Sequence, residues 1–166
     1  MTLGMSLSTF TLVHVVLSLV GILTGFIVIF GMFAAKRMNG MTALFLLTTV
    51  LTSISGFGFP NAHITPGIII GIISLVALTI AILARYVGHL GGASRWIYVV
   101  MAVLAEYFNV FVLVAQGFMK VPALHSMAPT GTETPFKIAQ GLVLLIFIVI
   151  GVYAVKKFHP GAEPAA

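Results

Sequence analysis

The sequence contains very little charge and no aspartate. Only 7% of its 166 residues are charged, eight of them Lys or Arg and three of them Glu. A soluble globular domain carries about 25% charged residues, so this composition excludes a soluble globular enzyme. It also excludes a disordered chain, because such chains are poor in apolar residues, whereas 60% of this one is hydrophobic and its mean hydropathy is +1.20. The class that remains is an integral membrane protein.

Cysteine is absent as well. Its absence excludes a disulfide scaffold, a thiolate zinc site and an iron–sulfur cluster. Without aspartate the chain has no Ser-His-Asp triad, and no phosphate loop, dinucleotide-binding glycine motif or zinc-protease motif occurs. The basic residues stand in ones and twos between apolar runs, so we reject a nucleic-acid partner. These absences favour a protein without catalytic activity.

What the sequence does contain is five long apolar runs. A membrane helix needs about 20 apolar residues to cross roughly 30 Å of hydrocarbon, and the runs do not alternate as membrane β-strands do. We predict an all-α integral membrane protein, a bundle of five transmembrane helices in a single domain over residues 1–166. The first nine residues hold no Lys or Arg, so we expect no cleavable signal peptide. The predicted spans are 10–35, 41–59, 65–86, 96–119 and 135–153, and residues 158–166 form a short polar tail.

The basic residues also predict the orientation. Six of them fall on one side of the predicted membrane and two on the other, and cytoplasmic loops are the ones enriched in Lys and Arg. We therefore expect the N-terminus outside and the C-terminus in the cytoplasm, with Tyr86, Trp96 and Tyr98 at the cytoplasmic interface. The six are Lys36, Arg37, Arg85, Arg95, Lys156 and Lys157; the two are Lys120 and Lys137.

Small residues predict where the helices pack. Lipid is as apolar as leucine, so membrane helices associate through close contacts at small residues and through interhelical hydrogen bonds. Gly21 and Gly25 share a face of the first span with His14 and Ser18. Further small residues lie on the second and third spans, at Thr48, Thr49, Thr52, Ser53, Ser55, Gly56, Gly67, Gly71 and Ser74.

Glu106 is the residue that points most directly to a function. It lies near the middle of the fourth span, where an ionisable group costs about 3 kcal/mol and must face protein or water. No basic residue is expected at its depth, so we expect a neutral carboxyl that donates to a hydroxyl or carbonyl. It belongs to a polar stripe along the whole helix, formed by Arg95, Tyr98, Ala102, Glu106, Asn109, Gln116 and Lys120. Such a stripe is either a proton, cation or ligand path or the hydrogen-bonded interior face of a bundle.

The histidines raise the question of a metal or a haem. Three of the five, together with a thioether, fall on the outer side at His14, His63, His125 and Met127. These ligand types suit copper, but their spacing in the sequence is not that of a metal motif. Haem b would need a second ligand within a span, and only His14 is an intramembrane histidine. We predict no cofactor, with haem or copper as the alternatives.

The chain resembles uncharacterised small multi-pass inner-membrane proteins of proteobacteria. That resemblance implies a bacterial inner membrane and five spans, and it implies no activity. It is carried by Gly71-Ile-Ile-Ser-Leu75, Ala84-Arg-Tyr86, Arg95-Trp-Ile-Tyr98, Ala115-Gln-Gly-Phe-Met-Lys-Val-Pro-Ala-Leu124, Ala128-Pro-Thr130 and Pro135-Phe136.

Three functions are consistent with these residues. The first is a non-catalytic accessory or interaction subunit, or a protein that binds a hydrophobic ligand; its partners are the lipid bilayer and either another membrane protein or a second copy of the chain. The second is a carrier or channel for protons, cations or a small solute that uses Glu106. The third is a haem or metal redox protein. The residues that we expect to bind a ligand or proton are His14, Ser18, Thr52, Glu106, Asn109, Gln116 and Lys120.

One expectation concerns the packing of the spans. His14 and Gln116 lie at similar depths below the outer ends of spans one and four, each on a face predicted to point inward. We expect these two spans to be neighbours or near neighbours. The two side chains would then face one interior cavity below the loop 121–134, since polar groups at membrane depth must line protein or water.

Overall fold

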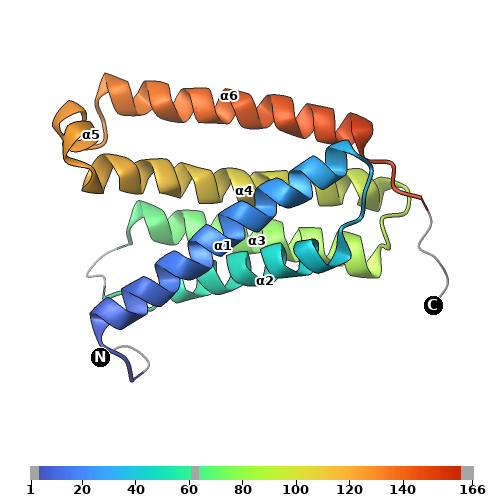
Figure 1. The fold of residues 1–166 in the computed structure, drawn as a ribbon, viewed down its shortest axis with the longest axis horizontal. Helices are drawn as coiled ribbons and strands as arrows, with labels where there is room; N and C mark the ends of the chain where they lie inside the picture. The colour runs from blue at the N-terminus through green and yellow to red at the C-terminus, as the bar shows by residue number, and fades with distance from the viewer. Residues whose placement is uncertain (1–3, 61–63, 162–166) are drawn as a thin grey trace.

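The computed structural model describes residues 4–60 and 64–161 (Figure 1). These residues form α-helices and one short π-helical segment, and no β-sheet occurs within the described ranges. The elements in chain order are α1 (Leu7–Phe33), α2 (Asn39–Gly56), α3 (Pro66–Ile82), the π-helix η1 (Leu83–Val87), α4 (Ala93–Lys120), α5 (Pro122–Met127) and α6 (Thr134–Lys157).

Five of the helices are long and apolar enough to cross a membrane. They are α1, α2, the continuous rod formed by α3 and η1, α4 and α6. Within the described residues, the all-helical class and five helices able to span a membrane are therefore confirmed. The loop 121–134 contains the short helix α5. It begins at Pro122, because a proline fits the first turn of a helix, where its missing N–H is not needed.

The sequence marks several helix boundaries with side chains that satisfy free backbone groups. The Ser6 hydroxyl accepts a hydrogen bond from the Thr9 amide at 3.2 Å and so caps α1. Thr65 caps α3 in the same way through the amide of Ile68, and Pro66 occupies the first turn. These are the usual caps of helix N-termini, where the first amides have no partner within the helix.

The helix α4 lies at the centre of the bundle. It packs against α3, α6 and α1, while α1 packs mainly on α2. Figure 1 shows α1 running obliquely across the other helices, with α4 and α6 side by side. Two names are used for the ends of the bundle. The α5 end contains the beginning of α1, the end of α4 and the short helix α5. The η1 end contains the end of α1 and the π-helix η1.

The buried apolar core is concentrated toward the η1 end. There Met32, Phe45 and Leu78 pack on the first half of α4 around Val99 and Ala102. Toward the α5 end, α1 and α4 contribute few fully buried residues. The close packing that holds membrane helices together is thus strongest in one half of the bundle.

At the η1 end, two arginines form hydrogen bonds with backbone and side-chain groups of other chain segments. Arg85, only 6% exposed, donates from Nη2 to the Arg37 carbonyl at 2.8 Å and to Asn39 Oδ1 at 2.7 Å. Arg95 donates to the carbonyls of Val155 and Phe158 at 2.9 and 2.8 Å. Both arginines therefore tie together chain segments that are distant in the sequence.

The placement of Tyr98 corrects one prediction. We expected its ring at the membrane interface, as for Tyr86 and Trp96, which are exposed. Tyr98 is instead 1% exposed, and the Arg85 guanidinium lies over its ring at 5.0 Å. The ring faces inward because Tyr98 lies on the polar stripe of α4, which is turned toward the bundle interior.

Candidate functional site

The helices α1 and α4 meet where Glu106 lies against Gly25. The Glu106 carboxyl occupies the space beside the Gly25 Cα, so that a methyl group added to Gly25 would overlap it. Gly21, one turn earlier on α1, faces the hydroxyls of Thr48 and Thr49 on α2. The Gly21/Gly25 pair predicted from the sequence is therefore a packing face, and it lets both neighbouring helices approach α1 closely.

Glu106 is completely buried, with 0% of its surface exposed. Its Oε2 accepts a hydrogen bond from Asn109 Nδ2 at 3.1 Å, and the same amide contacts Thr49 Oγ1 at 3.3 Å. Its Oε1 is buried without a hydrogen-bond partner among the described residues. We expected a hydroxyl or carbonyl as the partner of Glu106, whereas the structure places a neighbouring amide there, which connects Glu106 to a hydroxyl only indirectly.

A cavity of about 550 Å³ begins beyond Asn109 and extends toward the α5 end. It is lined by α1, α2, α3 and α4 and is partly open, in the half of the bundle that has few fully buried residues. Apolar residues such as Ile22, Ile70 and Phe108 supply most of its wall. Its size is within the range of roughly 300–1,000 Å³ found for small-molecule sites.

The polar residues of the cavity are mostly those predicted from the sequence. Six of the seven predicted ligand-binding residues line it, and the seventh, Glu106, lies directly behind Asn109. The six are His14, Ser18, Thr52, Asn109, Gln116 and Lys120. The expectation that His14 and Gln116 face one cavity between neighbouring spans is confirmed.

The hydrogen bonds of His14 indicate which of its ring nitrogens carries a hydrogen. The Ser55 hydroxyl donates to the Thr52 carbonyl at 3.0 Å, so its oxygen is an acceptor toward His14 Nδ1 at 2.8 Å. Nδ1 therefore carries a hydrogen and donates it. The ring also packs edge-on against Phe59, with centroids 5.1 Å apart. This arrangement leaves Nε2 without a hydrogen-bond partner in the described part of the chain.

The histidines are not gathered into a metal site where the structure can be described. His63 lies outside the described residues. His125 Nδ1 donates to the Phe118 carbonyl at 3.3 Å, and Met127 is exposed. Within residues 4–60 and 64–161, no group of three His, Cys, Asp or Glu side chains could hold a metal ion.

Sequence reasoning missed two interior polar contacts near the site. Thr49, which we had assigned to packing alone, is the residue of α2 that contacts Asn109. Gln140 on α6 donates to the Phe111 carbonyl of α4 at 3.0 Å, and its Oε1 is buried without a partner among the described residues. A polar residue in the first turns of an otherwise apolar span was the available signal for Gln140.

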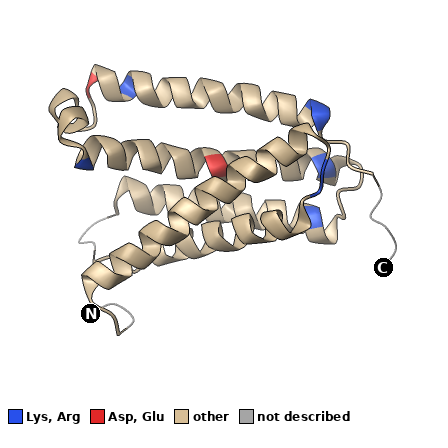
Figure 2. Ribbon diagram, in the orientation of Figure 1, with Lys and Arg blue, Asp and Glu red and all other residues tan. Residues whose placement is uncertain are grey.

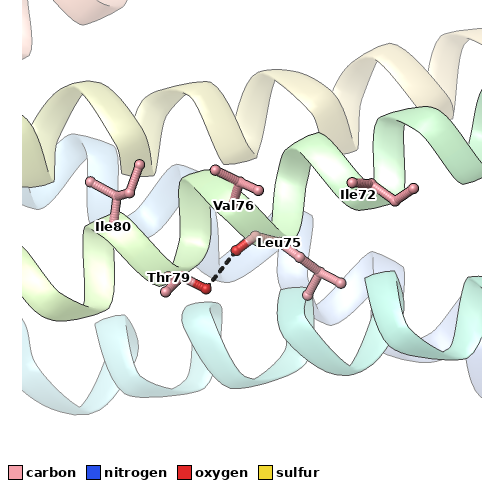
Figure 3. A pocket seen from close by; sticks show the side chains of 5 residues that line it. All are labelled: Ile72, Leu75, Val76, Thr79 and Ile80. Atoms are coloured by element: carbon pink, nitrogen blue, oxygen red, sulfur yellow. Dashed lines mark hydrogen bonds between the residues drawn. The ribbon is translucent and has the colours of Figure 1, made fainter.

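A second hollow, of about 340 Å³, lies along α3 and offers no comparable site (Figure 3). Its lining consists of the side chains of five residues from that one helix, Ile72, Leu75, Val76, Thr79 and Ile80. The only hydroxyl among them, that of Thr79, donates to the Leu75 carbonyl of its own helix at 2.8 Å. This surface therefore has the character of a lipid-facing groove.

Comparison of the chain with protein-family models, curated proteins and solved structures finds no match. The geometry of the site is therefore the basis for a functional conclusion.

Proposed function

We propose that the protein is a non-catalytic membrane protein that binds a small, mainly apolar ligand in the cavity between α1, α2, α3 and α4. The observation that carries this proposal is the cavity itself, about 550 Å³ in volume, with an apolar wall and a few convergent polar groups. Pockets that bind small molecules have this composition, in which apolar area supplies affinity and a few polar groups orient the ligand.

The distribution of charge supports an orientation in a bacterial inner membrane. Basic residues are more numerous at the η1 end than at the α5 end, as Figure 2 shows. With the positive-inside rule, we place the η1 end and the C-terminus in the cytoplasm and the N-terminus outside. The cavity would then lie in the outer half of the membrane.

The test is to fill the cavity without disturbing the helix contacts. Ser18 is suitable because its hydroxyl donates to the His14 carbonyl of its own helix at 2.7 Å, so Ser18→Phe removes no interhelical hydrogen bond. Val76→Phe is the matched control, since Val76 is exposed on α3. Native mass spectrometry of protein released from its native membrane should show a bound small molecule in the wild type and in Val76→Phe.

Ser18→Phe should lose that bound mass while it retains the melting temperature of the control. A wild-type protein free of bound small molecules would contradict the proposal, and so would a Ser18→Phe variant that still carries the same ligand.

A second candidate function, a proton or cation path, is favoured by Glu106. Its carboxyl is buried, one oxygen lacks a partner among the described residues, and Asn109 connects it to the cavity. A buried ionisable group at membrane depth is typical of proton pathways. Proton flux into liposomes should fall sharply in Glu106→Gln, which retains the shape of the side chain, and equal flux in both proteins would remove Glu106 from any transport mechanism.

A further inference from the structure

We infer that the ligand of this cavity is a single-chain carboxylic acid, a fatty acid whose carboxyl group lies between His14 and Lys120 and whose chain extends toward Phe108. This inference rests on the proposed ligand-binding function and adds the chemical class of the ligand. Three observations lead to it: the sign of charge around the cavity, the hydrogen-bonding state of His14, and the length of the apolar wall.

The first observation is the charge of the lining. Among the described residues that line the cavity, Lys120, at the C-terminal end of α4, is the only Lys or Arg, and none is acidic. Lys120 and His14 both line the cavity, on α4 and α1. A cationic head group would be repelled there, whereas an anionic group gains a charge-assisted hydrogen bond from the ammonium group.

The second observation is the donor and acceptor pattern of His14. Because Nδ1 donates to Ser55, Nε2 is the nitrogen that is left for a ligand. A neutral imidazole accepts at Nε2 from a carboxylic acid, and a protonated imidazole donates there to a carboxylate. The pair formed by His14 and a carboxyl group is therefore satisfied by one shared proton, whichever of the two groups holds it.

The third observation is the length and shape of the apolar wall. Along α4 the lining residues run from Lys120 to Phe108, a distance of about 18 Å at 1.5 Å per residue. That is more than half of the roughly 30 Å hydrocarbon thickness. The wall between these residues is mainly apolar, with Val112 and Leu113 on the same helix, and Asn109 and Gln116 are its polar members there. A single extended acyl chain fits a space of this length, with its polar end at the membrane surface.

The experiment uses a tryptophan placed at the deep end of the cavity. The chain contains one tryptophan, Trp96, near the η1 end, so Trp96→Phe with Phe108→Trp creates a single reporter. The control reporter, Trp96→Phe with Ile146→Trp, is exposed on α6, twelve residues from Thr134, just as Phe108 is twelve residues from Lys120. Both proteins are placed in phosphatidylcholine nanodiscs and titrated with dodecanoate or dodecanol brominated at the chain end.

We expect brominated dodecanoate to quench the cavity reporter saturably and the control reporter only in proportion to its concentration in the lipid. Unlabelled dodecanoate should reverse the quenching, dodecanol should need at least about tenfold more, and dodecyltrimethylammonium should not compete. If all three compete equally, the inference is wrong while the cavity still binds apolar ligands. If neither brominated compound quenches the cavity reporter saturably, the fatty-acid inference is overturned, whereas the proposed function fails only if the wild-type protein from its native membrane carries no bound small molecule.

A charge variant tests the head-group site without a reporter in the cavity. Lys120→Met should weaken dodecanoate binding about tenfold, measured by native mass spectrometry of the otherwise unmodified protein, and should leave dodecanol binding unchanged. Lys137→Met is the matched control, because Lys137 is also at the α5 end but does not line the cavity. Equal effects of the two variants would overturn the assignment of Lys120 to the carboxyl group.

Discussion

The carboxyl group of Glu106 on α4 lies directly against the Cα of Gly25 on α1. This contact places the buried acid in the interface between the two helices, and the cavity begins about one helical turn beyond it, at Asn109. The buried acid of α4 and a glycine of α1 are therefore complementary in shape.

This complementarity predicts that Gly25→Ala destabilises the protein. The added methyl group would overlap the fully buried Glu106 carboxyl, and overpacking of this kind costs about 1–3 kcal/mol. The free energy of unfolding should therefore fall by that amount, and Glu106→Ala in the same chain should recover part of the loss, because residues in contact are not additive. Gly141→Ala is the control, since a Cβ at Gly141 meets nothing within 4 Å. Wild-type stability in Gly25→Ala would contradict the contact.

A second prediction concerns Arg85. Its guanidinium donates two hydrogen bonds from Nη2 and lies over the Tyr98 ring at 5.0 Å. Arg85→Lys keeps the charge but loses the planar group, so we expect a loss of about 1.5–3 kcal/mol in the free energy of unfolding. Lys156→Arg, at an exposed position, should change stability by no more than about 0.5 kcal/mol. Similar small effects for both variants would show that the hydrogen bonds of Arg85 do not stabilise the fold.

His14 and His159 offer a matched comparison between an interior and a surface histidine. His14 bonds Ser55 at 2.8 Å and packs on Phe59, whereas His159 is exposed. His14→Ala should lower the free energy of unfolding by about 1 kcal/mol, and His159→Ala should have little effect. Thermal unfolding followed through the fluorescence of Trp96 measures both, and equal melting temperatures would argue against the His14 contact.

Glu133, before the first residue of α6, predicts a dependence of stability on pH. Desolvation raises the pKa of Glu133, but hydrogen bonds from the Thr130 hydroxyl and from the amides of Thr130 and Thr132 together outweigh it and lower this pKa to about 2. Its usual value in an unfolded chain is about 4.3. Because the folded pKa is the lower one, the stabilisation is present above about pH 4.3 and is lost as the pH falls through about 2.

Two-dimensional NMR of the Thr130 and Thr132 amides should show this titration with a midpoint near pH 2, as the pKa of about 2 requires. In Glu133→Gln the two amides should not titrate. The contribution of residue 133 to the free energy of unfolding should then no longer change between about pH 4.3 and about pH 2. A midpoint close to the unperturbed glutamate pKa in the wild type would mean that the hydrogen bonds do not persist in the membrane-embedded protein.

Much of the candidate site could be predicted from the sequence because the spacing of polar residues within one helix indicates which of them share a face. A polar stripe at helical spacing defines one face of α4, and a polar face at membrane depth must turn inward. Asn109, Gln116 and Lys120 accordingly line the cavity. The prediction for Tyr98 was wrong because tyrosine is also common at the membrane interface. Whether its ring is buried depends on neighbouring residues, here on Arg85 in η1, whose guanidinium lies over the ring.

The amino-acid sequence by itself determined the number of membrane helices and which face of each is polar, since both follow from the hydropathy and periodicity of single segments. Only the tertiary structure decided which polar groups meet. Glu106 lies against Gly25 and behind Asn109, and the cavity opens beyond them rather than at the opposite end. The physical reason is that helix crossing, and with it the place where packing is loose, depends on contacts between side chains far apart in the chain.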